Sequence, residues 1–63
     1  MTEQQYRIEA RSKRGEQFLI LTDSRSRALH FAGVFRASPE EYPQVSVEVG
    51  GRIWIGARIG EIP

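Results

Sequence analysis

Apolar and polar residues alternate over positions 6–11 of the chain, and the same alternation returns over 45–49 and 53–59. A period of two residues is that of a β-strand with one buried face. Residues 17–22 are instead apolar at four consecutive positions, which is typical of a strand covered on both faces. Four strands are therefore predicted, and the second is expected to be central or covered on both sides.

One helix is predicted between the second and third strands. Asp23 or Ser24 can accept the free amides at its start, and the helix is expected to run to about Ala37. Its apolar stripe follows the spacing i, i+3, i+4, i+7 at Ala28, Phe31, Ala32 and Phe35. The element order predicts an α+β fold, a two-layer ββαββ domain with one helix packed on a four-stranded, mainly antiparallel sheet. Strand orders 2-1-3-4 and 1-2-4-3 both keep neighbouring strands antiparallel, and the apolar second and fourth strands favour the latter.

The turn between the last two strands decides which sheet face carries Trp54, the only tryptophan. A two-residue Gly-Gly turn over 50–51 would set Val47 opposite Trp54 and divide the apolar residues between the two faces. A three-residue loop over 50–52 sets Val47 opposite Ile55 and keeps the aliphatic residues together. Because a slip of one residue exposes several aliphatic side chains at about 1.5 to 3 kcal/mol each, we expect the three-residue loop. Trp54 would then lie on the open face, where its removal leaves stability nearly unchanged.

Length and composition limit the classes of function. The 63 residues are predicted to form one small domain, 1–63. The absence of cysteine and the presence of one histidine argue against disulfides and metal clusters, and no nucleotide-cradling motif is present, so no cofactor is predicted. The longest apolar run, 18–21, is far shorter than a membrane span, and the first residues lack the apolar segment of a signal peptide. A cytoplasmic protein with no membrane association is therefore expected.

An enzyme is not expected. Ser26 and His30 stand four residues apart on one side of the predicted helix, so a serine and its base could meet there. The sequence offers no third group to orient the imidazole and no donors for an oxyanion. No catalytic residue is predicted.

An exposed tryptophan among arginines predicts a protein-binding surface. Aromatic and arginine side chains are enriched where interfaces derive most of their binding energy. The predicted surface lies on the open sheet face and consists of Trp54, Arg52, Arg58, Arg7 and Arg11. A protein partner is favoured, and a homodimer, or cover by the chain's own residues 59–63, is the alternative.

Nucleic acid is the second candidate partner. Bases could stack on Trp54 while arginines contact phosphates. Other possible anion contacts flank the second strand: Lys13, Arg14, Arg25 and Arg27. The net charge of only +1 makes this interpretation the weaker one.

In size and layout the whole chain resembles the small proteins of phage and other mobile elements, including CRISPR inhibitors. These proteins commonly act by covering a surface of a larger protein. The resemblance implies a small regulatory or inhibitory protein and identifies no site residue. The sequence thus predicts a non-catalytic protein-interaction module.

Overall fold

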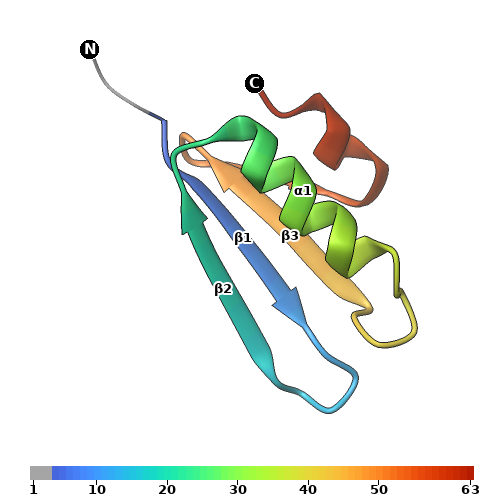
Figure 1. Cartoon of the computed structure of the whole chain (residues 1–63). Coiled ribbons are helices and arrows are strands. Elements are labelled where there is room, and N and C mark those ends of the chain that lie inside the picture. Colours follow the sequence, from blue (N-terminus) through green and yellow to red (C-terminus); the bar gives the residue numbers. More distant parts are fainter. Residues whose placement is uncertain (1–3) are drawn as a thin grey trace.

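A computed structural model describes residues 4–63 and has the predicted two-layer α+β architecture (Figure 1). One helix packs against a four-stranded antiparallel sheet. The elements are β1 (Tyr6–Arg11), β2 (Gln17–Thr22), α1 (Arg25–Arg36), β3 (Gln44–Val49), β4 (Arg52–Ile55) and a 3-10 helix, η1 (Gly56–Glu61). The order ββαββ is confirmed, followed by one further short helix.

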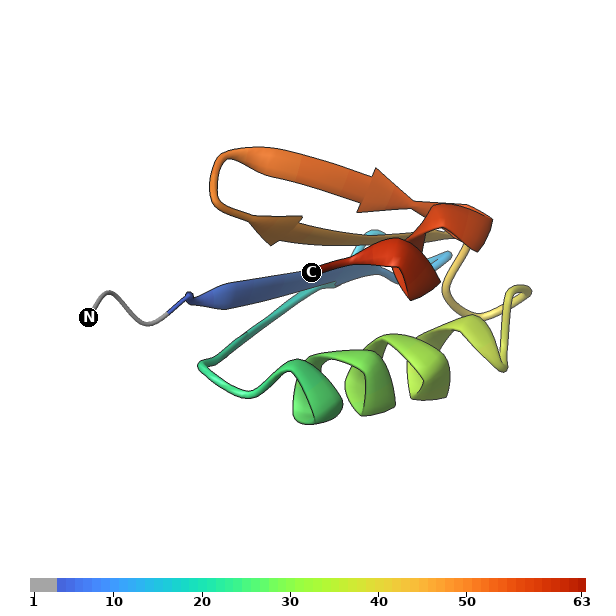
Figure 2. The same cartoon turned by 90° about the horizontal axis from the view of Figure 1, so that it is seen from above.

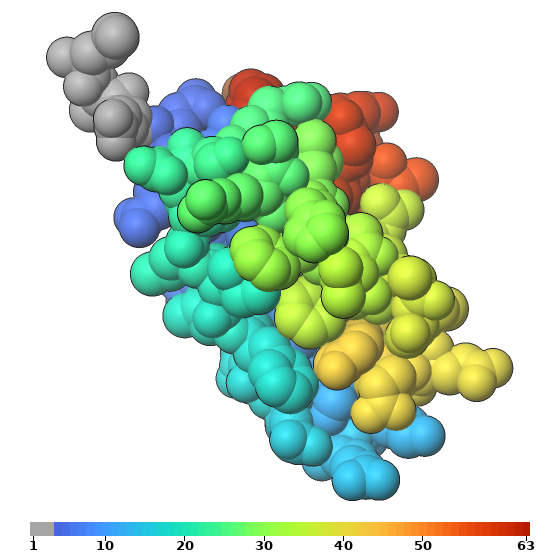
Figure 3. All heavy atoms as spheres, viewed as in Figure 1, coloured from blue at the N-terminus to red at the C-terminus, as the bar shows by residue number. Residues whose placement is uncertain are grey.

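The strand order is β2-β1-β3-β4, so the favoured order 1-2-4-3 is wrong and β2 lies at an edge. Both β2 and β3 pair antiparallel with β1 and therefore run parallel to each other. Two parallel strands need a crossover, and α1 supplies it by passing over β1. The helix consequently packs on β1 and β3 and makes few contacts with β2. Figure 3 shows β2 lying beside the helix rather than beneath it.

Helix α1 starts as its sequence predicts, but Phe31 of the predicted apolar stripe is only partly buried and is not part of the core. The Ser24 Oγ accepts a hydrogen bond from the Arg27 amide at 3.3 Å, which caps the first turn. Ala28 and Ala32 are fully buried against the sheet. Because alanine is small, the helix approaches closely the buried side chains of the central strands, chiefly Ile8 and Val47.

The fourth strand ends at Ile55, four residues earlier than the alternation predicts. The chain turns at Gly56, whose φ of 63° suits glycine, and η1 folds back on the same side of the sheet as α1 (Figure 2). Ile59 and Ile62 are thereby buried in the core at 1% exposure. Two hydrogen bonds hold this tail, from Tyr6 Oη to the Pro63 carbonyl at 2.7 Å and from Arg25 Nε to the Ile62 carbonyl at 2.9 Å.

The β3–β4 hairpin has a two-residue turn, so the predicted three-residue loop is wrong. Val47 pairs with Trp54 and Val49 with Arg52. Gly50 and Gly51 have φ values of 57° and 81°, the positive pair that a type I′ turn requires and that matches the twist of the strands. Trp54 therefore lies on the helix side, packed against the core.

Two glycines of this fold should respond oppositely to alanine. A Cβ at Gly33, in the exposed part of α1, would meet no atom within 4 Å, and its φ is not positive. Gly33→Ala should therefore raise the free energy of unfolding by about 0.5 to 1 kcal/mol. Gly51→Ala, at φ 81°, should lower it by about 1 to 2 kcal/mol. Urea titration measures both, and destabilisation by Gly33→Ala would contradict the open surroundings of that residue.

Candidate protein-interaction surface

The sheet has one face that neither α1 nor η1 covers, and we call it the open face. Strand pairing and the alternation of side chains determine its members. From edge to edge it comprises Gln17, Leu19 and Leu21 of β2, Arg7, Glu9 and Arg11 of β1, Gln44, Ser46 and Glu48 of β3, and Ile53 and Ile55 of β4.

Two apolar margins run along the edges of the open face. Leu19 and Leu21 on β2 are 51% and 55% exposed, and Ile53 and Ile55 on β4 are 62% and 63% exposed. Four large aliphatic side chains thus stand in water on one face of the sheet. Large apolar side chains exposed in clusters commonly mark a binding site.

The centre of the open face carries four charged side chains whose net charge is zero. Two arginines on β1 are balanced by Glu9 on β1 and Glu48 on β3. The Arg7 Nη2 lies 3.0 Å from the Glu9 Oε1, and both side chains remain well exposed to water. Arg7 is also the cross-strand neighbour of Glu48. Because exposed pairs contribute only about 0.2 to 1 kcal/mol each, these charges add little to the stability of the chain.

The structure brings only two of the five predicted interaction residues to the open face, Arg7 and Arg11. Trp54 is partly buried on the opposite face, so its predicted exposure away from the helix is wrong. Arg52 is exposed beside the turn, paired with Val49 on the helix side of the sheet, and Arg58 lies in η1. The predicted cluster around the tryptophan does not form.

The four possible anion contacts are divided between the two ends of β2. Lys13 and Arg14 are in the turn before β2, and the Lys13 Nζ lies 3.7 Å from the Glu41 Oε2. Arg25 and Arg27 are in the first turn of α1, which follows the other end of β2. The Arg25 guanidinium is engaged with the Ile62 carbonyl. These residues form no common basic site.

The sequence contains a pattern that could have identified Leu19 and Leu21 as surface residues. The β2 segment is apolar on both sides, and such a strand needs cover on both sides wherever it lies in the sheet. Leu19 and Leu21 lie on the face opposite α1, which no element covers, and they stand exposed. The isoleucines of β4 are the residues that the alternative two-residue turn would have exposed.

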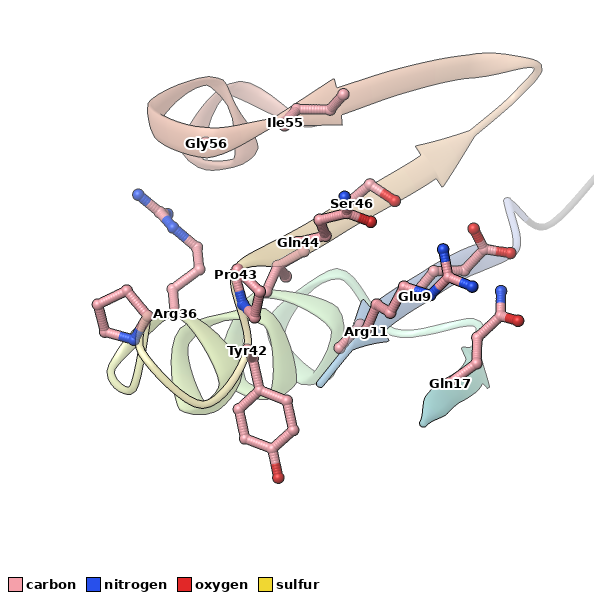
Figure 4. A pocket seen from close by; sticks show the side chains of 13 residues that line it. Glu9, Arg11, Gln17, Arg36, Tyr42, Pro43, Gln44, Ser46, Ile55 and Gly56 are labelled. Carbon is pink, nitrogen blue, oxygen red and sulfur yellow. The ribbon is translucent and has the colours of Figure 1, made fainter. Parts of the chain in front are cut away.

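The open face continues into a hollow of about 550 Å³ at the end where β1 finishes and β3 begins (Figure 4). Its wall combines open-face residues, such as Arg11, Gln44 and Ile55, with Arg36 and Tyr42 from the end of α1 and the connection to β3. Within residues 4–63, no three histidine, cysteine or acidic side chains gather as metal ligands. The hollow extends the apolar and polar surface available to a partner.

Ser26 and His30, the pair considered for catalysis, make other contacts. The Ser26 Oγ shares a hydrogen bond of 3.1 Å with the Ser24 Oγ at the helix cap. The His30 ring packs edge-on against Phe31, with 5.5 Å between ring centres. No hydrogen bond joins the Ser26 hydroxyl to the His30 ring.

The chain matches no protein-family model, and the comparisons with curated proteins and with solved structures return no significant match. Function must therefore be argued from the surfaces of the described residues. In residues 4–63, no helix is long and apolar enough to cross a membrane.

Adjacent residues on β4 provide a test of which face is covered. Trp54→Ala should lower the free energy of unfolding by about 2 to 4 kcal/mol, because it empties space beside the core. Ile53→Ala, at a side chain 62% exposed, should change it by no more than about 0.5 kcal/mol. Thermal or urea unfolding measures both variants. The reverse ranking would place the isoleucine inside and the tryptophan outside.

Proposed function

We propose that this protein is a non-catalytic interaction module that binds another protein surface through its open sheet face. The observation that carries the proposal is the set of four aliphatic side chains, each more than half exposed, along the margins of that face. Because about half of each side chain is already covered, burying the remainder contributes about 1 to 2 kcal/mol per residue. A protein that occludes these margins would gain much of its affinity there.

The polar centre supplies specificity in this proposal. Arg7, Glu9, Arg11 and Glu48 stand in fixed positions on two paired central strands. Charges arranged on a rigid scaffold favour a partner with the opposite pattern and repel others. The proposed mode of action is therefore occlusion of one surface on a partner protein, as expected for a small regulatory or inhibitory protein.

A protein partner fits the open face better than nucleic acid does. Binding to a phosphate backbone is driven by excess positive charge, whereas this face carries equal numbers of arginine and glutamate side chains. Single strands bind by stacking bases on aromatic rings, and all the open-face positions of the strands are aliphatic or polar. Trp54, the aromatic residue proposed for stacking, faces the core.

Site-specific photo-crosslinking tests the proposed function. A benzophenone amino acid at position 53, on the open face, should give a discrete covalent adduct in cells that produce the protein. The same probe at position 34 should not, because Val34 is comparably exposed, at 54%, but lies on α1. The adduct is resolved by mass and its protein component is identified by mass spectrometry.

A matched pair of substitutions tests whether the adduct depends on the open face. Leu21→Glu, on the far margin of the open face, should reduce the position-53 adduct at least about tenfold while the chain stays folded. Val34→Glu, on the helix, should leave it unchanged. An adduct that forms equally from both positions, or that survives Leu21→Glu, would contradict binding through this face.

A further inference from the structure

Strand pairing arranges the open face in rows that run across the sheet. One row reads Leu21, Arg7, Glu48 and Ile53 from β2 to β4, and the next reads Leu19, Glu9, Ser46 and Ile55. The third row contains Gln17, Arg11 and Gln44. Each of the first two rows has an aliphatic residue at both ends and polar residues between them, so each row can pair with its own reverse.

Two sheets that pack face to face commonly keep their strands roughly aligned. A twofold axis relating two such copies lies either along the strands or across them. With the axis along the strands, each row of one copy meets the same row of the other in reverse order. Arg7 then faces Glu48 of the second copy, and Leu21 faces Ile53.

The same axis also pairs the remaining rows favourably. Leu19 meets Ile55 of the other copy, Glu9 meets Ser46, and Arg11 meets Gln44. With the axis across the strands, by contrast, Arg7 would face Arg11 and Glu9 would face another Glu9. Like charges directly opposed at an interface are unfavourable, so the charge pattern selects the axis along the strands.

We infer that the occupant of the open face is a second copy of this chain, related by a twofold axis parallel to the strands. The inference rests on the proposed function and names its partner. Each apolar margin of one copy covers the opposite margin of the other, and two symmetry-related Arg7–Glu48 contacts lie between them. The Arg7–Glu9 pair within each copy, 3.0 Å apart, extends each contact into a three-residue network.

The size of the face sets the expected strength of this dimer. Three strands of six residues and one of four, about 4.8 Å apart, span roughly 360 Å². Two copies together would bury about 800 to 1,000 Å², which is near the lower limit for a specific interface. The dimer is therefore expected to be reversible, with a dissociation constant in the micromolar range or weaker.

Sedimentation of the purified chain tests the inference. The wild-type protein should shift from the 7.2 kDa monomer toward a species of twice that mass as its concentration rises from micromolar to millimolar. Arg7→Glu and Glu48→Arg each place like charges opposite one another at two positions of the dimer. Each should weaken self-association at least about tenfold, whereas Arg14→Glu, in the exposed β1–β2 turn, should not.

Mixing the two variants separates contacts between copies from contacts within one copy. A mixed dimer of Arg7→Glu and Glu48→Arg has opposite charges at both positions, so the mixture should associate although neither variant does so alone. Arg7 and Glu48 are also neighbours within one sheet, but a defect inside one chain cannot be corrected by adding another. Failure of the mixture to associate would overturn the proposed axis.

The double variant Arg7→Glu/Glu48→Arg keeps the test decisive if either single variant fails to fold, because it retains opposite charges within its own sheet. It should dimerise with itself as the wild type does. Because the exchange leaves the mass of the chain unchanged, the wild type is labelled with nitrogen-15, and native mass spectrometry should then detect no dimer of intermediate mass. Free mixing of the two would overturn the inferred geometry.

The result for the wild-type chain also separates this inference from the proposed function. A chain that stays monomeric up to millimolar concentration contradicts the second copy as occupant. If position 53 then still crosslinks to a different protein and Leu21→Glu abolishes that adduct, the proposed function stands without the dimer. If no adduct forms either, both proposals fail.

Discussion

The arrangement of both sheet faces depends on the two-residue turn at Gly50 and Gly51. Both residues have positive φ, and this fixes β4 so that Trp54 faces the helix side while its neighbours Ile53 and Ile55 face water. One residue more in this turn would exchange the two sets. The cost of exposing two isoleucines is offset by the tryptophan and by the tail that folds back beside it, which buries Ile59 and Ile62.

The crossover through α1 is the second constraint on the sheet. Because β2 and β3 are parallel, the helix between them covers β1 and β3 and leaves both edges of the sheet with little cover. The chain uses the tail to cover part of the β4 side of the core. At the opposite edge of the sheet, β2 exposes apolar residues and carries neither proline nor charge within Gln17–Thr22. Proteins usually place proline or charged residues on edge strands to prevent association with other strands. The proposed contact between copies would cover the open-face side of this strand.

Local pattern was enough to predict most of the fold but not its surfaces. The alternation around Ile8 and Val47, and the helix starting after Ser24, were correct because each depends on residues close in sequence. Strand order was wrong because the two-sided apolar character of β2 indicates a need for cover and does not say what supplies it. The tail was mistaken for a strand because an isoleucine such as Ile59 satisfies either conformation. The predicted interaction site was wrong because it depended on the hairpin register. In the observed register its central residue, Trp54, lies on the helix side of the sheet.

The proposed interaction face depends on the register of the β3–β4 hairpin. Nuclear Overhauser contacts across this hairpin are the most direct test of that register. We expect contacts between the Trp54 ring and the Val47 methyl groups, and between the backbones of Glu48 and Ile53. Contacts of Val47 with Ile55 and of Val49 with Ile53 would instead show a three-residue loop. The isoleucine margin would then lie in the core, and the open face would lose two of its four exposed aliphatic side chains.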